Sequence, residues 1–233
     1  MDMIKVYWLS IPKSLKLEDI SSWVKLLDLE EQTTYKSYKV DFKKKEFIIG
    51  RLLLKFVISK HLTLDLSDIT FRKKQYGKLY LKNVREEENT NLDFNLTHSE
   101  GIVACAIANR AVGIDVEFMK EIHLDIIKQV LSNDEMLFLQ ASPKEMWKKL
   151  FYQIWTRKEA YLKAIGTGFI FEPNTLNIPI NDKLDSAGWG YFTTIIRNNY
   201  LLSVVTAENH GAYSNLEVQE LDIYDLLTSI VVN

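Results

Sequence analysis

The stretch DFNLTHSEGIVACAIANRAVGIDVE, residues 93–117, decides the fold of this chain. It holds three runs of β-branched and apolar residues, which turn residues separate at Gly101 and at Asn109–Arg110. Runs of this length between turn residues are typical of β-strands. The stretch therefore predicts three consecutive strands joined by short turns.

The last five residues of the stretch, GIDVE at 113–117, place two acids at the end of an apolar run. Side chains of a strand alternate between its faces, so Asp115 and Glu117 share one face. Ile114 and Val116 then point into the core. Two carboxylates on one face repel each other unless a positive group lies between them. These five residues alone fit either an exposed strand end with solvated acids or a charged site, and a third acid would favour the site.

The rest of the chain mixes helices and strands. Apolar residues at a spacing of three and four predict helices, whereas short β-branched and aromatic runs predict strands. Helices are expected at 17–28, 30–38, 42–62, 124–131, 132–140 and 142–166, and strands at 4–11, 68–81 (a hairpin turning near Gly77), 190–197, 200–207 and 216–222. The predicted fold class is α+β, with helices segregated onto antiparallel sheets.

Three residues mark the expected helix ends in the second half. Ser132 is a candidate N-cap for the helix that follows it. Ser142 is expected to cap the long helix, with Pro143 at the first helical position. Gly166 is expected to end that helix, because glycine commonly follows the last helical turn.

Length, charge and cysteine content narrow the class of protein. A chain of 233 residues suits one large domain or two small ones. Its net charge of −2 gives no general attraction to nucleic acid or to an anionic membrane. Cys105 is the single cysteine and lies in an apolar run, which indicates a core position and excludes an internal disulfide. Without a recognisable signal peptide or an apolar run of membrane-spanning length, a cytoplasmic location is expected.

A third carboxylate lies in WTRKEAYLKAIGTG, residues 155–168. Trp155, Glu159 and Lys163 follow one another at intervals of four and therefore lie in one line on a helix. Taken alone, the acid and the lysine would be an ordinary surface pair, and the tryptophan a residue that packs the helix against a strand.

The order of these motifs is more specific than any one of them. FNLTHS, then GIDVE, then WTRKEAYLKAIGTG resembles the 4′-phosphopantetheinyl transferases, in the larger class typified by the activator of surfactin synthetase. The resemblance implies two similar α+β halves, here 1–111 and 112–233, with the active site between them. It implies transfer of the phosphopantetheine arm of coenzyme A onto a serine of an acyl- or peptidyl-carrier protein, with release of adenosine 3′,5′-bisphosphate.

The resemblance also implies a metal site. Asp115, Glu117 and Glu159 would gather around Mg²⁺, with Mn²⁺ as the alternative. Mg²⁺ prefers oxygen ligands and commonly shares a substrate phosphate, so it would relieve the repulsion between the acids. Glu159 is the preferred base for the carrier's serine, and Glu117 or a metal-bound water is the rival assignment. Lys163 is expected to hold or protonate the departing phosphate.

The coenzyme A contacts implied by the resemblance are Lys78 in YGK, Thr97 and His98 in FNLTHS, and Lys158. Two features depart from the family pattern. Leu79 stands where the family usually has proline, and the first-half lysines that hold phosphate have no clean counterpart. Several basic residues remain as alternatives for that role, namely Lys36, Lys39, Lys44, Lys45 and Arg51.

The expected partner is an apo-carrier protein docking near residues 118–132, and a monomer is expected because one chain supplies both halves of the site. Two rival functions stay open. One is a catalytically inactive carrier-binding module, although retention of all three acids and Lys163 argues against it. The other is a metal-dependent nuclease, which the acidic net charge disfavours.

Overall fold

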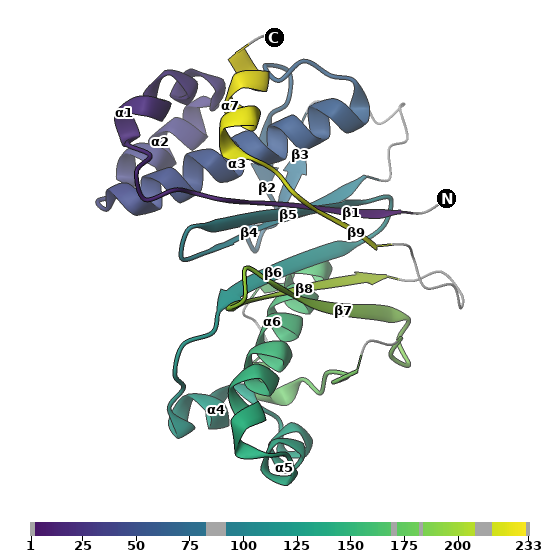
Figure 1. Ribbon diagram of the computed structural model, residues 1–233. Coiled ribbons are helices and arrows are strands. Elements are labelled where there is room, and N and C mark those ends of the chain that lie inside the picture. The colour runs from purple at the N-terminus through teal and green to yellow at the C-terminus, as the bar shows by residue number, and fades with distance from the viewer. Residues whose placement is uncertain (1–2, 83–91, 169–171, 182–183, 208–215, 232–233) are drawn as a thin grey trace.

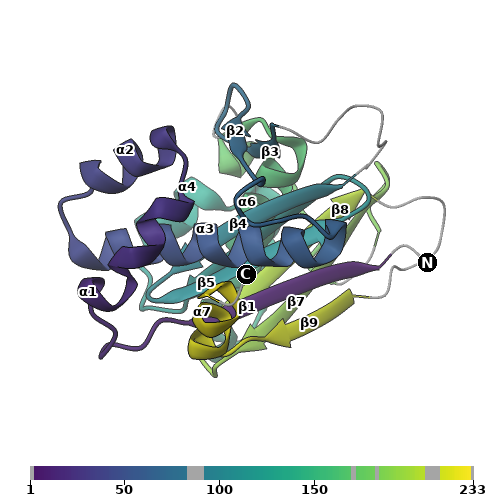
Figure 2. The same cartoon turned by 90° about the horizontal axis from the view of Figure 1, so that it is seen from above.

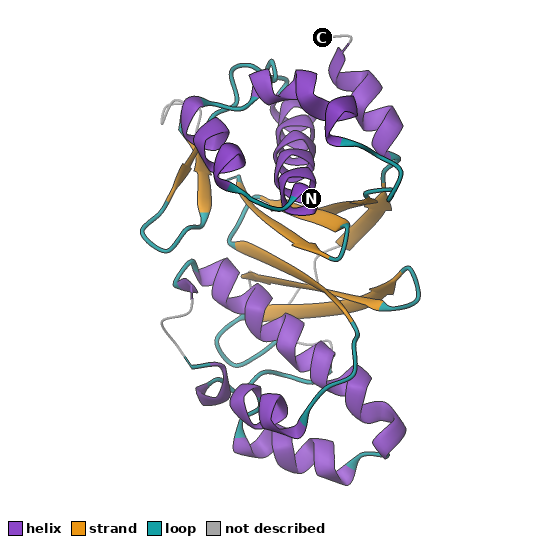
Figure 3. Cartoon of the chain, turned by 90° about the vertical axis from the view of Figure 1, so that its left-hand side faces the viewer, coloured by secondary structure: helices purple, strands orange, loops and turns teal. Residues whose placement is uncertain are grey.

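Two β-sheets lie face to face at the centre of the molecule, and helices cover their outer sides (Figure 1, Figure 3). The computed structural model describes residues 3–82, 92–168, 172–181, 184–207 and 216–231. The α+β class with antiparallel sheets is confirmed. Among the described residues, no helix is long and apolar enough to cross a membrane.

The first sheet has the strand order β4-β5-β1-β9. Its strands are β1 (Ile4–Ser10), β4 (Asp93–Ser99), β5 (Ile102–Ala108) and β9 (Leu216–Glu220). The β1 strand pairs antiparallel with β5 and parallel with β9. Its helices are α1 (Leu17–Ile20), α2 (Leu29–Ser37), α3 (Asp41–Leu62) and α7 (Ile223–Val231), and a hairpin of β2 (Phe71–Lys73) and β3 (Leu79–Leu81) lies beside it. Figure 2 shows α3 lying along this sheet.

The second sheet has the order β6-β8-β7, and both pairs are antiparallel. Its strands are β6 (Val112–Phe118), β7 (Trp189–Ile196) and β8 (Tyr200–Ala207). Its helices are α4 (Leu124–Val130), α5 (Asn133–Ala141) and α6 (Trp147–Ile165). The three strands predicted within 93–117 are therefore confirmed, and the third of them leaves the first sheet to open the second.

Burial on both faces explains the unbroken apolar run of β5. Every residue of this strand is buried. Cys105 faces the core under α3, while Ala104 and Ala106 face the second sheet. Small side chains at that contact let the sheets approach closely, as in close-packed protein interiors. The core position predicted for the single cysteine is confirmed, and burial raises the pKa of its thiol to about 12.

The end of the chain returns to the first half. The β9 strand extends the first sheet beside β1, and α7 packs against the core under α3. This segment falls within 112–233, the range assigned to the second half from sequence. The division into 1–111 and 112–233 remains a prediction, and any truncation that follows it would remove an edge strand from the first sheet.

Several element boundaries differ from those predicted. The helix expected at 17–28 is a single α-helical turn followed by a 3₁₀ helix, Ser21–Leu26. The α7 helix was missed, although Asp222 accepts hydrogen bonds from the backbone N–H groups of Tyr224 and Asp225. An acid in that position is a usual helix start.

The predicted start of the long helix is wrong. Pro143 has an extended backbone, residues 144–146 form a 3₁₀ turn, and α6 begins at Trp147. The Ser142 hydroxyl instead donates to the carbonyl of Phe138 at the end of α5. The other two predicted helix ends are confirmed. Ser132 caps the start of α5, and Gly166 ends α6 in a left-handed conformation.

Candidate active site

The two sheets meet along β4 and β6, which are edge strands of their own sheets. An edge strand leaves backbone groups without a strand partner. Here short polar side chains of β4 accept hydrogen bonds from backbone N–H groups of β6. Asp93 accepts from Val112 at 2.9 Å, and Asn95 accepts from Ile114 at 3.2 Å. This arrangement explains why every second residue of DFNLTHS is polar, and it fixes β6 relative to the first half.

Thr97 continues this row of side chains and brings β4 to the first acid. Its hydroxyl donates to Asp115 Oδ1 at 3.0 Å. Lys163 Nζ lies 2.6 Å from the same oxygen and 3.3 Å from the threonine hydroxyl. The structure thus brings together three residues that the sequence analysis placed in the site, and they come from β4, β6 and α6.

A close approach of α6 to β6 makes this contact. Gly113 lies against the helix, and a Cβ atom there would sit 2.0 Å from the carbonyl oxygen of Ala160 and 2.5 Å from the nitrogen of Ala164. No side chain fits at such distances. Gly113 and the two alanines are therefore the reason that GIDVE and the KEAYLKA segment of α6 lie side by side.

Glu117 is held by groups from both halves. The Ser99 hydroxyl donates to its Oε2 at 2.8 Å. Burial, and then the charge of Asp115, raise the pKa of Glu117, while the Ser99, Lys163 and Trp155 side chains lower it. Trp155 therefore packs α6 and also lies close enough to Glu117 to favour its charged form. Ser99 was not predicted as a site residue, although its place two residues after Thr97 in the polar row of β4 indicates the same face of the strand.

Glu159 is buried beside other negatively charged side chains. Its side chain is 7 % exposed. Burial, followed by the negative charge of Asp115, raises the pKa of Glu159 to about 7, while Lys163 acts in the opposite direction. Glu159 Oε1 and Asp115 Oδ2 are buried and have no hydrogen-bond partner in the described structure. Buried oxygens without a partner are costly, so the acids are suited to an added cation.

The chemistry of these donors fits a hard divalent ion, which takes carboxylate oxygens. As they stand, no three His, Cys, Asp or Glu side chains in the described part of the chain are gathered closely enough to hold a metal. The Lys163 ammonium meets Asp115 instead. The assignment of Asp115, Glu117 and Glu159 as metal ligands remains a prediction.

Two adjoining pockets lead from the acids into the first half. The first, of about 250 Å³, is lined in part by Glu159 and Lys163. The second, of about 280 Å³, is lined in part by Arg51, Lys73 and His98. Both pockets share four lining residues, which are Gly77, Lys78, Asn95 and Leu96. An elongated ligand could therefore extend from the acids to the helices of the first half.

Lys78 lines both pockets, but its ammonium is fully engaged. It donates to Asp93 Oδ2 at 2.5 Å and to the carbonyls of Val112 and Ala164 at 3.1 and 3.0 Å. An ammonium has three N–H donors, so none is left for a ligand in this arrangement. Lys78 ties the β2–β3 hairpin to β4, β6 and α6, and this role differs from the phosphate contact expected from sequence.

Lys158 is not brought to the site. Its side chain is fully buried and pairs with Glu135 at 2.5 Å. The remaining donors reach the carbonyls of Val130 and Pro173. The expected contact of Lys158 with coenzyme A has no support in this geometry, because the lysine holds α6 to α4 and to the 173–175 turn.

The basic residues of the first half differ in whether an acid already pairs with them. Arg51 lines the second pocket but is paired with the buried Glu31 at 2.7 Å. Lys73 also lines that pocket and is exposed, with its nearest acid, Glu30, at 4.0 Å. Sequence analysis missed Lys73, because nothing in the chain links β2 to the distant acids. Lys36, Lys39, Lys44 and Lys45 are not among the residues that line either pocket.

Comparison with known proteins accords with this architecture. Residues 14–110 match the family model described as 4′-phosphopantetheinyl transferase, N-terminal. Residues 111–212 match the model of the 4′-phosphopantetheinyl transferase superfamily. The chain belongs to this superfamily. Within it, the relatives indicate the Sfp-like type.

Three relatives illustrate the similarity. The 4′-phosphopantetheinyl transferase gsp of Aneurinibacillus migulanus is 29% identical over 77% of this chain and 73% of its own length. The 4′-phosphopantetheinyl transferase Sfp of Bacillus subtilis is 27% identical over 76% of this chain and 77% of its own. The 4′-phosphopantetheinyl transferase HetI of a Nostoc species is 32% identical over 54% and 53%, respectively.

Proposed function

We propose that this protein moves the phosphopantetheine arm of coenzyme A onto a serine of an apo acyl- or peptidyl-carrier protein. The serine oxygen forms a bond to the phosphorus that carries the pantetheine arm. The bond from that phosphorus to the bridging oxygen breaks, and adenosine 3′,5′-bisphosphate leaves with the electron pair. One observation carries the proposal: Lys163 pairs with Asp115, and Lys163 and Glu159 line a pocket that adjoins a second pocket in the first half.

The three acids are assigned to one Mg²⁺, with Mn²⁺ as the alternative. The assignment is supported by the partnerless oxygens of Asp115 and Glu159, which a cation would satisfy. A bound divalent ion would neutralise charge that develops on the phosphates during transfer. Ser99 orients Glu117 for its share of this site, and Trp155 favours its charged form.

Glu159 is assigned as the group that accepts the proton of the carrier's serine. Burial and the charge of Asp115 raise the pKa of Glu159 when no metal ion is bound, and a carboxylate held beside the reacting serine is a suitable proton acceptor. Lys163 sits on the same face of α6, one turn further along, and can move from Asp115 to the oxygen of the departing bisphosphate. Its positive charge would stabilise that oxygen as the bond breaks.

Coenzyme A is assigned to the two adjoining pockets. The pyrophosphate is placed near Lys163, and the nucleotide end is placed in the pocket that His98 and Lys73 line. Thr97 contributes indirectly, because its hydroxyl already donates to Asp115. Lys73 is the available first-half cation in this assignment, in place of the lysines that the sequence left as alternatives.

The carrier is assigned to the surface that follows β6, residues 118–132. In α4, Ile127 and Val130 face the core, whereas Leu124 and Ile126 are 61% and 46% exposed. Lys120 and Lys128 are exposed on the same segment. Exposed apolar residues rimmed by cations suit an acidic helical partner. A monomer is sufficient in this assignment, because one chain provides both walls of the cleft.

A mass measurement tests the function directly. The protein is incubated with coenzyme A, Mg²⁺ and an apo-carrier protein, and the carrier should gain the mass of one phosphopantetheine arm. The same mixture with a chelator, or with a carrier whose serine is replaced by alanine, should give no gain. A carrier that is bound but never modified would support the inactive binding module instead.

A further inference from the structure

Glu46, on α3, is an acid that the proposed function does not use. Its side chain is completely buried, with 0% exposure. Acids are rarely buried to this extent unless their charge and both oxygens are satisfied. The partners of Glu46 therefore indicate what the residue holds in place.

Its partners gather at the turn between β4 and β5. Glu46 Oε1 accepts a hydrogen bond from the backbone N–H of Gly101 at 3.1 Å. Its Oε2 accepts from Lys43 Nζ at 2.7 Å and lies 3.4 Å from Nδ1 of His98. One carboxylate thus joins α3 to the imidazole and to the backbone of the turn that follows it.

The contact between Glu46 and His98 leaves one ring nitrogen of the histidine for a ligand. The two nitrogens are distinct, and a carboxylate beside one of them fixes the orientation of the ring. Nδ1 is the ring nitrogen that meets Glu46, at 3.4 Å, so Nε2 is the nitrogen left for a ligand in the second pocket, which both residues line. The His98 side chain is 42% exposed, and among the described residues Glu46 is the acid within 4 Å of its ring.

We propose that Glu46 is a positioning residue, which holds the His98 imidazole so that Nε2 can donate to a phosphate oxygen of coenzyme A. The inference rests on the proposed function. Burial lowers the pKa of His98, while the charge of Glu46 acts in the opposite direction. An anionic phosphate at Nε2 would act in the same direction as Glu46 and favour the ring with both nitrogens protonated. Through Gly101 the same carboxylate anchors the turn after Ser99, whose hydroxyl holds Glu117.

The test is a double-mutant cycle read out as coenzyme A binding by calorimetry. Glu46→Gln keeps the acceptor for Gly101 but removes the charge opposite His98, and should weaken binding about tenfold, as expected for one charge-assisted contact. His98→Ala should weaken binding at least as much. In the His98→Ala background, Glu46→Gln should add less than twofold, because the ring it orients is gone.

A control and a steady-state measurement separate positioning from general damage. Lys43→Met removes the ammonium that pairs with Glu46, leaves the imidazole contact, and should change the coenzyme A affinity less than twofold. For Glu46→Gln, KM for coenzyme A should rise while KM for the carrier stays within twofold. If Glu46→Gln does not fold, Glu46→Asp, which is one methylene too short to reach the ring, takes its place with the same expected loss.

Different results would overturn the positioning role of Glu46 and the proposed transferase function. Full additivity of Glu46→Gln and His98→Ala, or unchanged binding in Glu46→Gln, would overturn the positioning role while leaving the transferase intact. Failure of the unsubstituted chain to bind coenzyme A at all would overturn the proposed function, and the inference with it.

Discussion

Lys163 and Asp115 form an ion pair across the contact between α6 and β6, with 2.6 Å between Nζ and Oδ1. The lysine therefore serves as a counter-ion of the acid cluster. A pair this short forms only because Gly113 lets the helix approach the strand. The pair also explains how acids that repel one another can share one site before any cation is bound.

Replacing Asp115 by alanine should abolish transfer and leave the fold intact. The substitution removes one carboxylate from the proposed metal site, while Lys163 keeps Thr97 as an acceptor. We expect the transfer rate at saturating Mg²⁺ to fall by roughly 10²-fold or more, as for other losses of electrostatic stabilisation. Circular dichroism checks the fold. A rate equal to that of the parent protein would show that the site is misassigned.

Replacing Glu159 by glutamine tests the choice of base. Glutamine has a similar size and keeps one oxygen, but it cannot accept the serine proton. The single-turnover rate should fall by roughly 10²-fold or more, the usual range for loss of a general base. Glu117→Gln is the comparison. A near-normal rate for Glu159→Gln with tight coenzyme A binding would move the proton transfer to another group.

The same substitution should stabilise the metal-free protein at high pH. The raised pKa of Glu159 means that folding favours its protonated form. The penalty is absent below about pH 4.5 and grows as pH rises to about 7, where the buried carboxyl ionises. Glu159→Gln removes that penalty, so its unfolding free energy should exceed that of the parent at pH 8, by up to about 3 kcal/mol. Urea unfolding in chelator at pH 4.5 and 8 measures the difference. Equal pH dependence in both proteins would contradict the shifted pKa.

Gly113→Ala should separate the acids by moving α6. Its Cβ would meet the backbone of Ala160 and Ala164, which cannot rotate away as a side chain can. We expect a destabilisation of roughly 1–3 kcal/mol, typical of overpacking, together with loss of transfer. Gly50→Ala is the matched control, because its Cβ meets only the side chains of Leu96 and Val103, at 3.1 Å or more. A fully active Gly113→Ala would show that the helix position is not critical.

Parts of this site that depend on neighbouring residues in the sequence could be predicted, whereas contacts between distant segments could not. Alternation within GIDVE and the spacing of four in α6 are local patterns, and they predicted which faces carry Asp115, Glu159 and Lys163. The structure brings Lys163 to Asp115, and Glu159 and Lys163 both line the first pocket. Their mutual approach depends on Gly113 and Ala160, whose small size carries meaning only when the helix lies on the strand.

Ion pairs between residues far apart in the sequence could not be predicted from it. Lys78 and Lys158 lie in motifs that suggest phosphate contacts, yet each ammonium is used up by a carboxylate and two carbonyls. Their acid partners, Asp93 and Glu135, are 15 and 23 positions away in the sequence and show no periodic relationship to them. Lys73 is the converse case, because it stands in no motif and still lines the second pocket.

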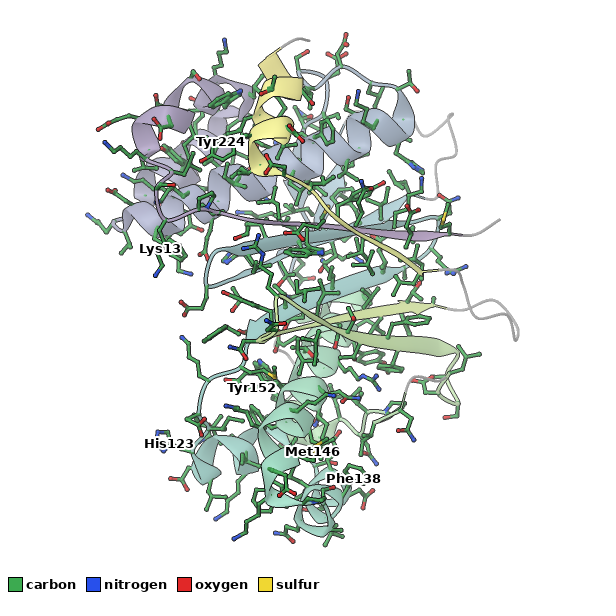
Figure 4. All side chains as sticks on the ribbon, in the orientation of Figure 1. Lys13, His123, Phe138, Met146, Tyr152 and Tyr224 are labelled. Carbon is green, nitrogen blue, oxygen red and sulfur yellow. The ribbon has the colours of Figure 1, made fainter. Side chains whose placement is uncertain are left out.

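The proposed docking surface, residues 118–132, was chosen because it follows directly after the acid Glu117 in the sequence. The segment begins one residue after Glu117, and the backbone N–H of Lys120 donates to the hydroxyl of Tyr152 on α6, at 3.1 Å. Figure 4 shows His123, directly before α4, at one outer edge of the second half, and Phe138 on α5 away from that edge. The proposal therefore places the carrier on α4, the helix that follows Asp115 and Glu117 most directly in the sequence, rather than on α5.

Reversing the charges of Lys120 and Lys128 to glutamate should therefore raise KM for an acidic carrier and leave KM for coenzyme A nearly unchanged. Both side chains are exposed, and Lys120 is already paired with Glu100 at 2.5 Å, so part of the effect will come from repulsion at that pair. Leu124→Ala should add to the increase, because a leucine 61% exposed would be buried by the carrier. Leu137→Ala, an equally exposed leucine on α5, is the matched control and should leave both constants unchanged. Equal increases in KM for both substrates would place the carrier on another surface, as would a larger effect from the α5 control than from Leu124→Ala.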